Sequence, residues 1–399
     1  MIRVLGAGGR ALYTRPLIGA LAITIAIHVA AYMLNAVLPF RATALGATGT
    51  QVGLMFSVTA GVAMFFRPVV GGWVDRHGVR VVLIPGVVVL ALTSLGLHGA
   101  GSPGALIVLM AGVGLANGLI STAAGVLAAQ ATAPAQRGEA LGLYYLGTSL
   151  AVAVAAPAGI ALLRLGGIEW NFYLVTVLAA LILLFTVLLT PTGAGRPDAA
   201  GGRLRLWSRH ALGAAAVMIL ITLGQSSIVG FVPLYAERHG LGGWIGWFFA
   251  LYSVWMILCR ALLRGISDQV GRVQVLGPSM TATAMGFLML AAPPSGATLI
   301  AGALFLGTGA SLTYPTMIAL LVDRTPDRER GLAMGTLSAS WDVGVVLGSA
   351  LVGFVIERLS FHAGFAVGAV GACAGLLTFV LLERARARRP AYPRPAEAV

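Results

Sequence analysis

The sequence contains no lysine, only two cysteines and very little charge for its length. Charged residues make up 10% of its 399 residues, whereas a soluble domain carries about 25%. The cysteines, Cys259 and Cys373, both lie inside apolar runs, which is typical of small buried side chains rather than of a disulfide or a metal site. The scarcity of charge excludes a soluble protein, and the cysteine positions argue against redox chemistry.

Apolar residues are correspondingly abundant, at 58% of the chain with a mean hydropathy of +0.92. A bilayer-spanning helix needs about 20 apolar residues, and the chain contains twelve stretches of about that length. Their length and their lack of polar-apolar alternation exclude barrel strands. The sequence therefore predicts an all-α integral membrane protein with twelve transmembrane helices and no separate soluble domain. We expect these helices near residues 17–40, 51–71, 81–99, 105–129, 140–163, 171–190, 211–235, 243–263, 274–293, 298–322, 332–356 and 363–382.

All 26 basic residues are arginine, and they give the chain a net charge of +13. In a soluble protein this imbalance would suggest a nucleic-acid partner. Here the arginines instead lie mainly in the loops on one side of the predicted spans. If the N-terminus is cytoplasmic, twenty arginines lie in cytoplasmic loops or tails, and only Arg41, Arg164, Arg238 and Arg358 lie outside. This positive-inside bias predicts a multi-pass protein of the inner (plasma) membrane with both termini in the cytoplasm and no nucleic-acid partner.

The chain repeats itself with a constant offset of 193 residues. Residues around the second span recur around the eighth, and residues around the fourth and fifth spans recur around the tenth and eleventh. The first set is Arg67, Gly72, Asp75 and Gly78, which recur as Arg260, Gly265, Asp268 and Gly271. This duplication predicts two six-helix bundles, at 1–190 and at 211–399 with its cytoplasmic tail, joined by a cytoplasmic linker at 191–210. Repeat-built bundles place their substrate site at the midplane between the halves.

The segment from Gly71 to Arg80, GGWVDRHGVR, resembles the loop signature of the major facilitator superfamily. The segment from Gly265 to Arg272 is a degenerate second copy. The resemblance covers essentially the whole chain. It implies the major facilitator fold and a monomeric secondary transporter that moves a small molecule by alternating access, without a cofactor or metal and without enzymatic activity.

The fifth span partially matches the drug and proton antiporter branch of that superfamily, which has a glycine-rich run ending in Gly-Pro. The matching residues are Gly147, Ala156, Pro157 and Gly159, with alanine in place of the expected glycine at 156. The resemblance therefore favours proton-driven efflux of a small, partly apolar compound. The alternatives are uptake of a sugar or an organic acid and, from another class, a membrane-embedded enzyme. The absence of mid-span arginine argues against a strongly anionic substrate.

The repeated loop also predicts a cytoplasmic gate. By pseudo-symmetry Asp75 should face the start of the eleventh span, and Asp268 the start of the fifth, where a carboxylate is stabilised by the positive end of the helix dipole. The resemblance implies that these contacts form a latch that breaks when the carrier opens inward; the alternative is that the loop only fixes topology. The gate residues we expect are Gly72, Asp75, Arg76, Gly78, Arg80, Arg137, Asp268, Gly271, Arg272 and Arg330.

One acidic residue, Asp342, lies in the middle of a span. It is twelve residues beyond Arg330, or about 18 Å along a helix. A charge at that depth costs roughly 2.5 to 3.5 kcal/mol, so the carboxyl should face water, find a partner on another helix or stay protonated. We expect it to couple transport to protons, with His28 as a candidate proton partner, or to bind a substrate cation. The alternative is a hydrogen bond that only holds two helices together.

Further polar and aromatic residues within the spans are candidates for the substrate cavity, although each alone is also typical of a hydrogen bond between helices. Arg67 and Arg260 share one repeat position near the cytoplasmic ends of their spans, where they could reach the cytoplasm or cap helix carbonyls, with a structural or gating role. The cavity candidates are Tyr32, Asn35, Asn117, Tyr145, Ser149, Gln225, Tyr252, Trp255, Tyr314, Ser338 and Trp341.

The latch can be tested by replacing Asp75 with asparagine. An acidic side chain at a helix N-terminus contributes about 0.3 to 1 kcal/mol when exposed and up to about 2 kcal/mol when partly buried. We therefore expect Asp75→Asn to reduce transport while leaving membrane insertion intact. The measurement is the transport rate per inserted molecule, and a wild-type rate in this variant would contradict the latch.

Overall fold

A computed structural model describes residues 14–132, 137–190, 207–263, 265–326 and 329–387. The described residues form helices and connecting turns and contain no strand. Twelve helices of the described part are long and apolar enough to cross a membrane. The predicted all-α fold with twelve membrane-spanning helices is therefore confirmed.

The first half of the chain forms six long helices connected by short turns. They are α1 (Arg15–Ala44), α2 (Gly49–His77), α3 (Val79–His98), α4 (Pro103–Gln130), α5 (Arg137–Gly166) and α6 (Glu169–Leu189). Since successive helices run in opposite directions, α1, α3 and α5 begin at the end of the molecule where the described chain begins. We call this the terminal end, and the opposite end the far end.

The second half forms six further spans, two of which are broken into shorter pieces. The seventh span comprises η3 (Arg209–Ala211), α7 (Leu212–Thr222), α8 (Gln225–Gly230) and α9 (Val232–Arg238). The eighth comprises η4 (Gly242–Trp244) and α10 (Ile245–Leu262), with the short α11 (Ile266–Gln269) after it. The remaining spans are α12 (Arg272–Ala291), α13 (Gly296–Asp323), α14 (Arg330–Arg358) and α15 (Phe361–Ala387).

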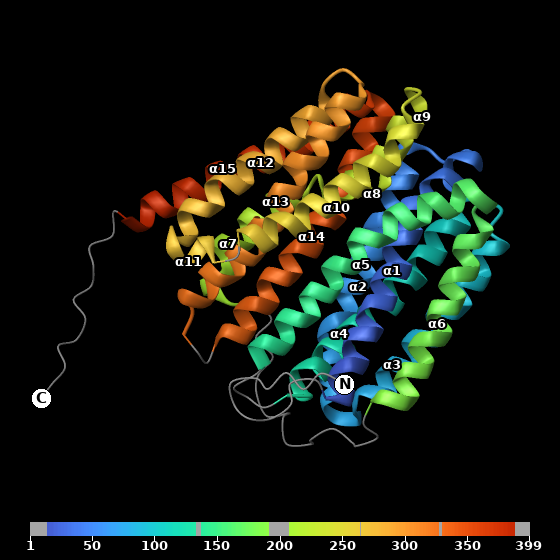
Figure 1. The fold of residues 1–399 in the computed structure, drawn as a ribbon, viewed down its shortest axis with the longest axis horizontal. Helices are drawn as coiled ribbons and strands as arrows, with labels where there is room; N and C mark the ends of the chain where they lie inside the picture. The colour runs from blue at the N-terminus through green and yellow to red at the C-terminus, as the bar shows by residue number, and fades with distance from the viewer. Residues whose placement is uncertain (1–13, 133–136, 191–206, 264, 327–328, 388–399) are drawn as a thin grey trace, which may run out of the picture.

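The two halves form two bundles that lie side by side (Figure 1). The blue to green helices α1 to α6 make one bundle, and the yellow to red helices from α7 to α15 make the other. The main contacts between them are those of α2 with α14 and of α5 with α10, and α8 also contacts α1 and α2. A site between the bundles can therefore take residues from these six helices.

Several helices begin at side-chain caps that the sequence supplies. Thr48 accepts a hydrogen bond from the Gln51 amide, and the Gln51 side chain accepts one from the Thr48 amide, which is a capping box. Gly78 and Gly271, which are 193 residues apart, have φ values of 87° and 107°. These positive φ values favour glycine, so the repeated loop glycine permits the sharp turn into α3 and α12.

The seventh span differs from the continuous helix expected at 211–235. It breaks between Thr222 and Gln225 and again at Phe231. Gly348 of α14 lies against the first break so closely that an added Cβ would stand 2.0 Å from the Leu223 carbonyl oxygen. The second break precedes Pro233, which has no N–H to continue the helix ladder. The hydropathy of the segment could not reveal either break.

The second span also differs, because α2 continues to His77 instead of ending near residue 71. Its last turns carry charged and aromatic residues, so the apolar run ends before the helix does. Arg67 therefore lies ten residues inside the helix rather than at its end. This places its side chain at the interface between the bundles, where it can reach the opposite half.

The bundles approach most closely at the far-end half of α2 and α14. An added Cβ on Gly53 would stand 2.3 Å from the Ser349 carbonyl oxygen, and one on Gly353 would stand 2.4 Å from the Gly49 carbonyl oxygen. The Phe56 and Phe231 rings, with centroids 6.5 Å apart, join the apolar core of the first bundle to the far end of the second. A separate apolar cluster fills the terminal end of the second bundle.

The close contact of Gly53 with α14 predicts that adding one methyl group at this position lowers the stability of the protein. We expect Gly53→Ala to lower the thermal unfolding midpoint of the purified protein, because backbone atoms of α14 would have to move. Gly61→Ala is a matched control on the same helix face, since its added Cβ would meet only Val346, 3.7 Å away. Alanine is the better helix former by about 1 kcal/mol, so the control should be neutral or stabilised. Equal midpoints for both variants would contradict the close packing of α2 on α14.

Candidate functional site

An ion pair joins the two bundles near the middle of their interface. Nη1 of Arg67, on α2, donates a hydrogen bond to Oδ2 of Asp342, on α14. The Asp342 residue is only 7% exposed, and the Arg67 side chain is 35% exposed. Asp342 therefore satisfies its charge through a partner on another helix, which is one of the three possibilities that its depth allows.

A second arginine crosses the interface in the opposite direction. Nη1 of Arg260, on α10, donates a hydrogen bond to the hydroxyl of Ser149, on α5. Arg260 is only partly accessible, and its Nε atom is buried without a hydrogen-bond partner among the described residues. The Arg260 contact resembles the Arg67 contact, but it ends on a neutral hydroxyl instead of a carboxylate.

These two contacts are equivalent by the internal repeat. Arg67 and Arg260 are 193 residues apart, and so are Ser149 and Asp342. The duplication therefore produced two arginine contacts of one geometry, each running from one bundle to the other. One retains a carboxylate at the receiving position, and the other has serine there.

Tyrosines from both bundles lie between the two arginine contacts. The Tyr32 hydroxyl lies within electrostatic range of Arg67 and Asp342. The Tyr252 hydroxyl lies near Tyr32, Arg260 and the Gln225 side chain. The structure thus brings five of the predicted residues into one polar layer across the interface: Tyr32, Ser149, Gln225, Tyr252 and Asp342.

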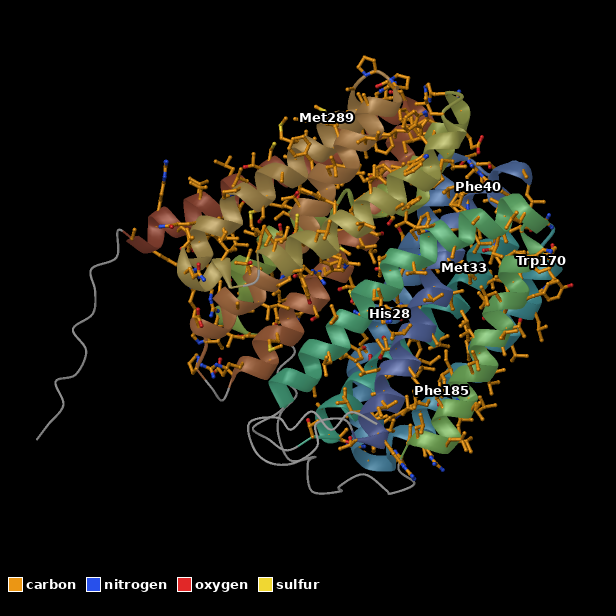
Figure 2. All side chains as sticks on the ribbon, viewed as in Figure 1. His28, Met33, Phe40, Trp170, Phe185 and Met289 are labelled. Carbon is orange, nitrogen blue, oxygen red and sulfur yellow. The ribbon has the colours of Figure 1, made fainter. Side chains whose placement is uncertain are left out.

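His28 lies midway along α1, with Met33 and Phe40 farther toward the far end (Figure 2). Its Nδ1 atom donates to the Thr24 carbonyl oxygen, 2.8 Å away, and its ring stacks on Tyr32 at a centroid distance of 6.5 Å. The direct partner of Asp342 is Arg67 rather than His28. His28 lies beside the polar layer, in contact with it through Tyr32.

Most of the remaining cavity candidates bond within their own bundle. Tyr314 and Ser338 share a hydrogen bond of 3.1 Å, and the Tyr314 ring meets the Trp341 ring edge-on at 5.2 Å. Trp255 donates from Nε1 to the Thr308 hydroxyl at 2.8 Å. Asn35 and Asn117 each have a buried Oδ1 atom without a hydrogen-bond partner in the described structure. The Tyr145 side chain lies outside the described structure.

The described gate residues also bond within one bundle. Arg80 donates to the Val187 and Thr190 carbonyl oxygens at the end of α6, at 2.7 and 2.6 Å. Arg272 forms an ion pair with Asp323 at 2.7 Å, and Arg330 donates to the Val322 carbonyl oxygen at 3.3 Å. An added Cβ on Gly72 would meet nothing within 4 Å, and Arg76 is exposed. The side chains of Asp75, Arg137 and Asp268 lie outside the described structure, so the latch stays a prediction.

Further polar contacts cross the interface at the far end. The Thr50 amide donates to Oε2 of Glu357 at 2.9 Å. Arg164 donates to the Gly242 carbonyl oxygen and forms an ion pair with Glu237 at 3.7 Å. Arg164 and Glu357 are again 193 residues apart. Hydrogen bonds and ion pairs between described residues of the two bundles thus extend from the far end to the level of the Arg67–Asp342 pair.

Sequence reasoning missed the cross-bundle contacts of Arg67 and Arg260, which it placed near the cytoplasmic ends of their spans. Arg67 is the last residue of the apolar stretch of α2, and Arg260 lies in the last turn of α10, yet both side chains reach the opposite bundle. A usable signal was present, because Ser149 and Asp342 differ by the same 193 residues as the two arginines. Applying the offset of 193 residues to Asp342 identifies Ser149 as its equivalent. The pairs Arg67 with Asp342 and Arg260 with Ser149 are then both candidates for contacts between the bundles.

The described residues contain no group of three or more histidine, cysteine or acidic side chains that could hold a metal ion. What the interface does contain is a layer of hydroxyl, guanidinium and carboxyl groups between two bundles of membrane helices. Such a layer can bind a polar part of a small molecule and hold or release a proton. A site at the interface between two repeated bundles is typical of membrane transporters.

Comparison with known proteins gives the family. The sequence profile of the Major Facilitator Superfamily matches residues 20–258 and 243–398, so this chain belongs to that superfamily. The Staphylopine export protein of Staphylococcus aureus is 23% identical over 94% of this chain and 96% of the relative. An uncharacterized MFS-type transporter of Methanocaldococcus jannaschii is 19% identical over 87% of this chain and 93% of the relative.

Solved structures share the fold. A POT family transporter in complex with a thioalcohol-conjugated peptide superimposes with a TM-score of 0.77 at 12% identity, over 97% of this chain and 98% of that one. The nucleoside transporter NupG gives a TM-score of 0.72 at 14% identity, over 91% of this chain and 99% of that one. The chain is therefore a multi-pass membrane transporter of small molecules and not an enzyme.

The Arg67–Asp342 pair predicts non-additive effects on stability. Removing one partner leaves the other charge uncompensated, which costs about 3 to 5 kcal/mol in a fully buried pair. Because the Arg67 side chain is 35% exposed, we expect roughly 1 to 2 kcal/mol for Arg67→Gln or Asp342→Asn after solvent screening. The double variant should lose less than the sum of the single losses.

The measurement is the unfolding midpoint of purified protein in detergent for all four forms. The Arg272–Asp323 pair is a suitable control, because Asp323 is half exposed and both residues belong to one bundle. A double-mutant cycle there should give almost no interaction energy. Additive losses at Arg67 and Asp342 would show that their charges do not depend on each other.

Proposed function

We propose that the protein exports a small, partly apolar compound across the inner membrane by alternating access, driven by protons moving through Asp342. The observation that carries this proposal is the placement of Asp342: a buried carboxylate that joins the two moving halves through Arg67. A group that titrates at this contact can change the attraction between the bundles, which is what coupling requires.

The arginine distribution supports an orientation in which the terminal end is cytoplasmic. In this orientation the far end faces outside, and the described contacts of Thr50 with Glu357 and of Arg164 with Gly242 hold the outer side together. These outer contacts are compatible with a state open to the cytoplasm, in which an exporter collects its substrate.

The proton step follows from charge. When Asp342 is ionised, it holds Arg67 and keeps α2 and α14 together at mid-depth. When Asp342 is protonated, its charge is lost, and the Arg67 guanidinium is released toward other acceptors. Because α2 and α14 belong to different bundles, protonation changes how firmly the bundles attach at this level. Binding of a proton from outside can therefore favour one of the two conformations. Release of that proton to the cytoplasm can then favour the other conformation.

The direction of transport is supported by the resemblance to the drug and proton antiporter branch. It is also supported by the name of the staphylococcal relative, which is an export protein. We propose that the functional unit is a monomer, because each of the two bundles needed for alternating access is present in one chain. The substrate site is the polar layer that contains Tyr32, Gln225 and Tyr252.

A proteoliposome assay with imposed pH gradients and a panel of small solutes tests this function. We expect wild-type protein to move solute against protons, and Asp342→Asn to lose the dependence on the gradient, because asparagine cannot carry the proton. Glu169→Gln is the control, since Glu169 is a half-exposed acidic residue at the far end beside His98. It should retain gradient-driven transport.

Three outcomes would count against the proposal. Gradient-independent movement in both wild type and Asp342→Asn would reduce Asp342 to a structural role. Solute movement in the same direction as the protons would support uptake of a sugar or an organic acid in place of export. Equal losses in Asp342→Asn and Glu169→Gln would show that the effect is not specific to the interface.

A further inference from the structure

The two repeat-equivalent arginine contacts differ in charge, and the difference leaves one arginine without a counter-ion. Arg67 meets the Asp342 carboxylate. Arg260 meets the Ser149 hydroxyl, and the ion pairs between described residues do not include it. Among the described residues, the middle of the interface therefore carries two arginines and one aspartate, an excess of one positive charge.

The sequence supplies no nearby acid for Arg260. Its own helix, α10, contains no acidic residue, and neither does α5 between Ala140 and Gly166. Glu139 precedes Ser149 by ten residues, or about 15 Å along a helix. Asp268 follows Arg260 by eight residues and lies beyond the turn at Gly265. The nearest acidic residues in or beside α5 and α10 are thus several residues away in sequence from the contact between Arg260 and Ser149.

Arg260 also has donor capacity to spare. A guanidinium has five N–H donors, and Ser149 accepts from one of its Nη atoms. The Nε atom is buried without a partner among the described residues. A partly buried cation with unused donors is costly, and an anion that accepts two parallel hydrogen bonds from the guanidinium fork would lower that cost. The Tyr252 hydroxyl, close to Arg260, adds a further polar group for such a ligand.

We propose that Arg260 binds the carboxylate of the transported compound, so that the substrate is a small organic monoanion with an apolar or aromatic remainder. The substrate carboxylate occupies the position that Asp342 occupies toward Arg67. The Tyr32 and Tyr252 rings, which belong to opposite bundles and lie near each other, face the rest of the molecule. This inference rests on the proposed function for its transport context, and it names the substrate class.

A single negative charge fits this site better than several. The excess at the interface is one positive charge, because Arg67 is already neutralised by Asp342. A carboxylate has the planar shape that a guanidinium binds through two parallel hydrogen bonds. Binding would also place a ligand between α10 and α5, the helix pair that joins the bundles on the side opposite α2 and α14.

The test uses matched probes that differ only in charge: benzoate against benzamide, and N-acetylphenylalanine against its amide. A ligand that binds the folded protein raises its unfolding temperature by mass action. We expect the carboxylates to stabilise wild-type protein in detergent and the amides to have little effect. Arg260→Gln should weaken carboxylate binding by about tenfold or more, because a charge-assisted pair is lost.

Two variants of Ser149 separate charge from shape. Ser149→Asp places a carboxylate at the position equivalent to Asp342, so Arg260 gains an internal partner that competes with the probes. This variant should fold with unchanged or higher stability and lose the response to carboxylates. Ser149→Asn has nearly the same shape without the charge, and it should retain a larger response than the aspartate variant. Arg384→Gln is the distant control and should respond like wild type, because Arg384 is exposed in the last turn of α15.

The inference is overturned if no carboxylate stabilises wild type more than its amide does, or if Ser149→Asp and Arg260→Gln respond like wild type. Misfolding of Arg260→Gln does not confuse the result, because Ser149→Asp keeps the arginine and changes only its partner. The binding assay uses no proton gradient. Carboxylate binding without proton-driven transport would therefore refute the proposed function alone, and proton-driven transport of neutral solutes would refute this inference alone.

Discussion

The ion pair between Arg67 and Asp342 is the interaction on which the arrangement of the two bundles depends. An isolated charge at this depth in a membrane protein is costly, so each of these residues requires the other bundle to be present and correctly placed. Close packing of α2 on α14 brings the pair together, and the pair in turn stabilises the packing at mid-depth. Fold and site are therefore not separable here, because the same helix contact provides both.

The internal repeat explains why equivalent residues of the two bundles meet at the interface. Differences between the two copies explain why these residues differ in charge. Three pairs of interface residues obey the offset of 193, namely Arg67 with Arg260, Ser149 with Asp342, and Arg164 with Glu357. Each pair occupies the same place in its bundle, yet the second and third pairs differ in charge. A symmetric scaffold thus carries an asymmetric distribution of charge. A small molecule without symmetry needs such an asymmetry if it is to bind in one orientation.

Much of the fold could be predicted from the sequence, because twelve long apolar runs and a constant repeat determine the helices and their two groups. The depth of Asp342 was also visible, since it follows from counting residues along one helix. The partner of Asp342 was not visible. Hydropathy ends the second span near residue 71, but α2 continues to His77, and the contact of Arg67 with Asp342 depends on how the two bundles pack. The break around Gly224 depends on packing against α14, and the break at Phe231 depends on Pro233. Hydropathy averaged over a whole span shows neither of these effects.

The glycines between α2 and α14 have a consequence for motion. At Gly53 and Gly353 the two helix backbones touch with no side chain between them, so this stretch lacks the interlocking knobs that normally fix one helix against another. Two smooth rods in contact can roll over each other without first disengaging. The far-end contact can therefore serve as a bearing, along which α2 and α14 roll as the two bundles tilt.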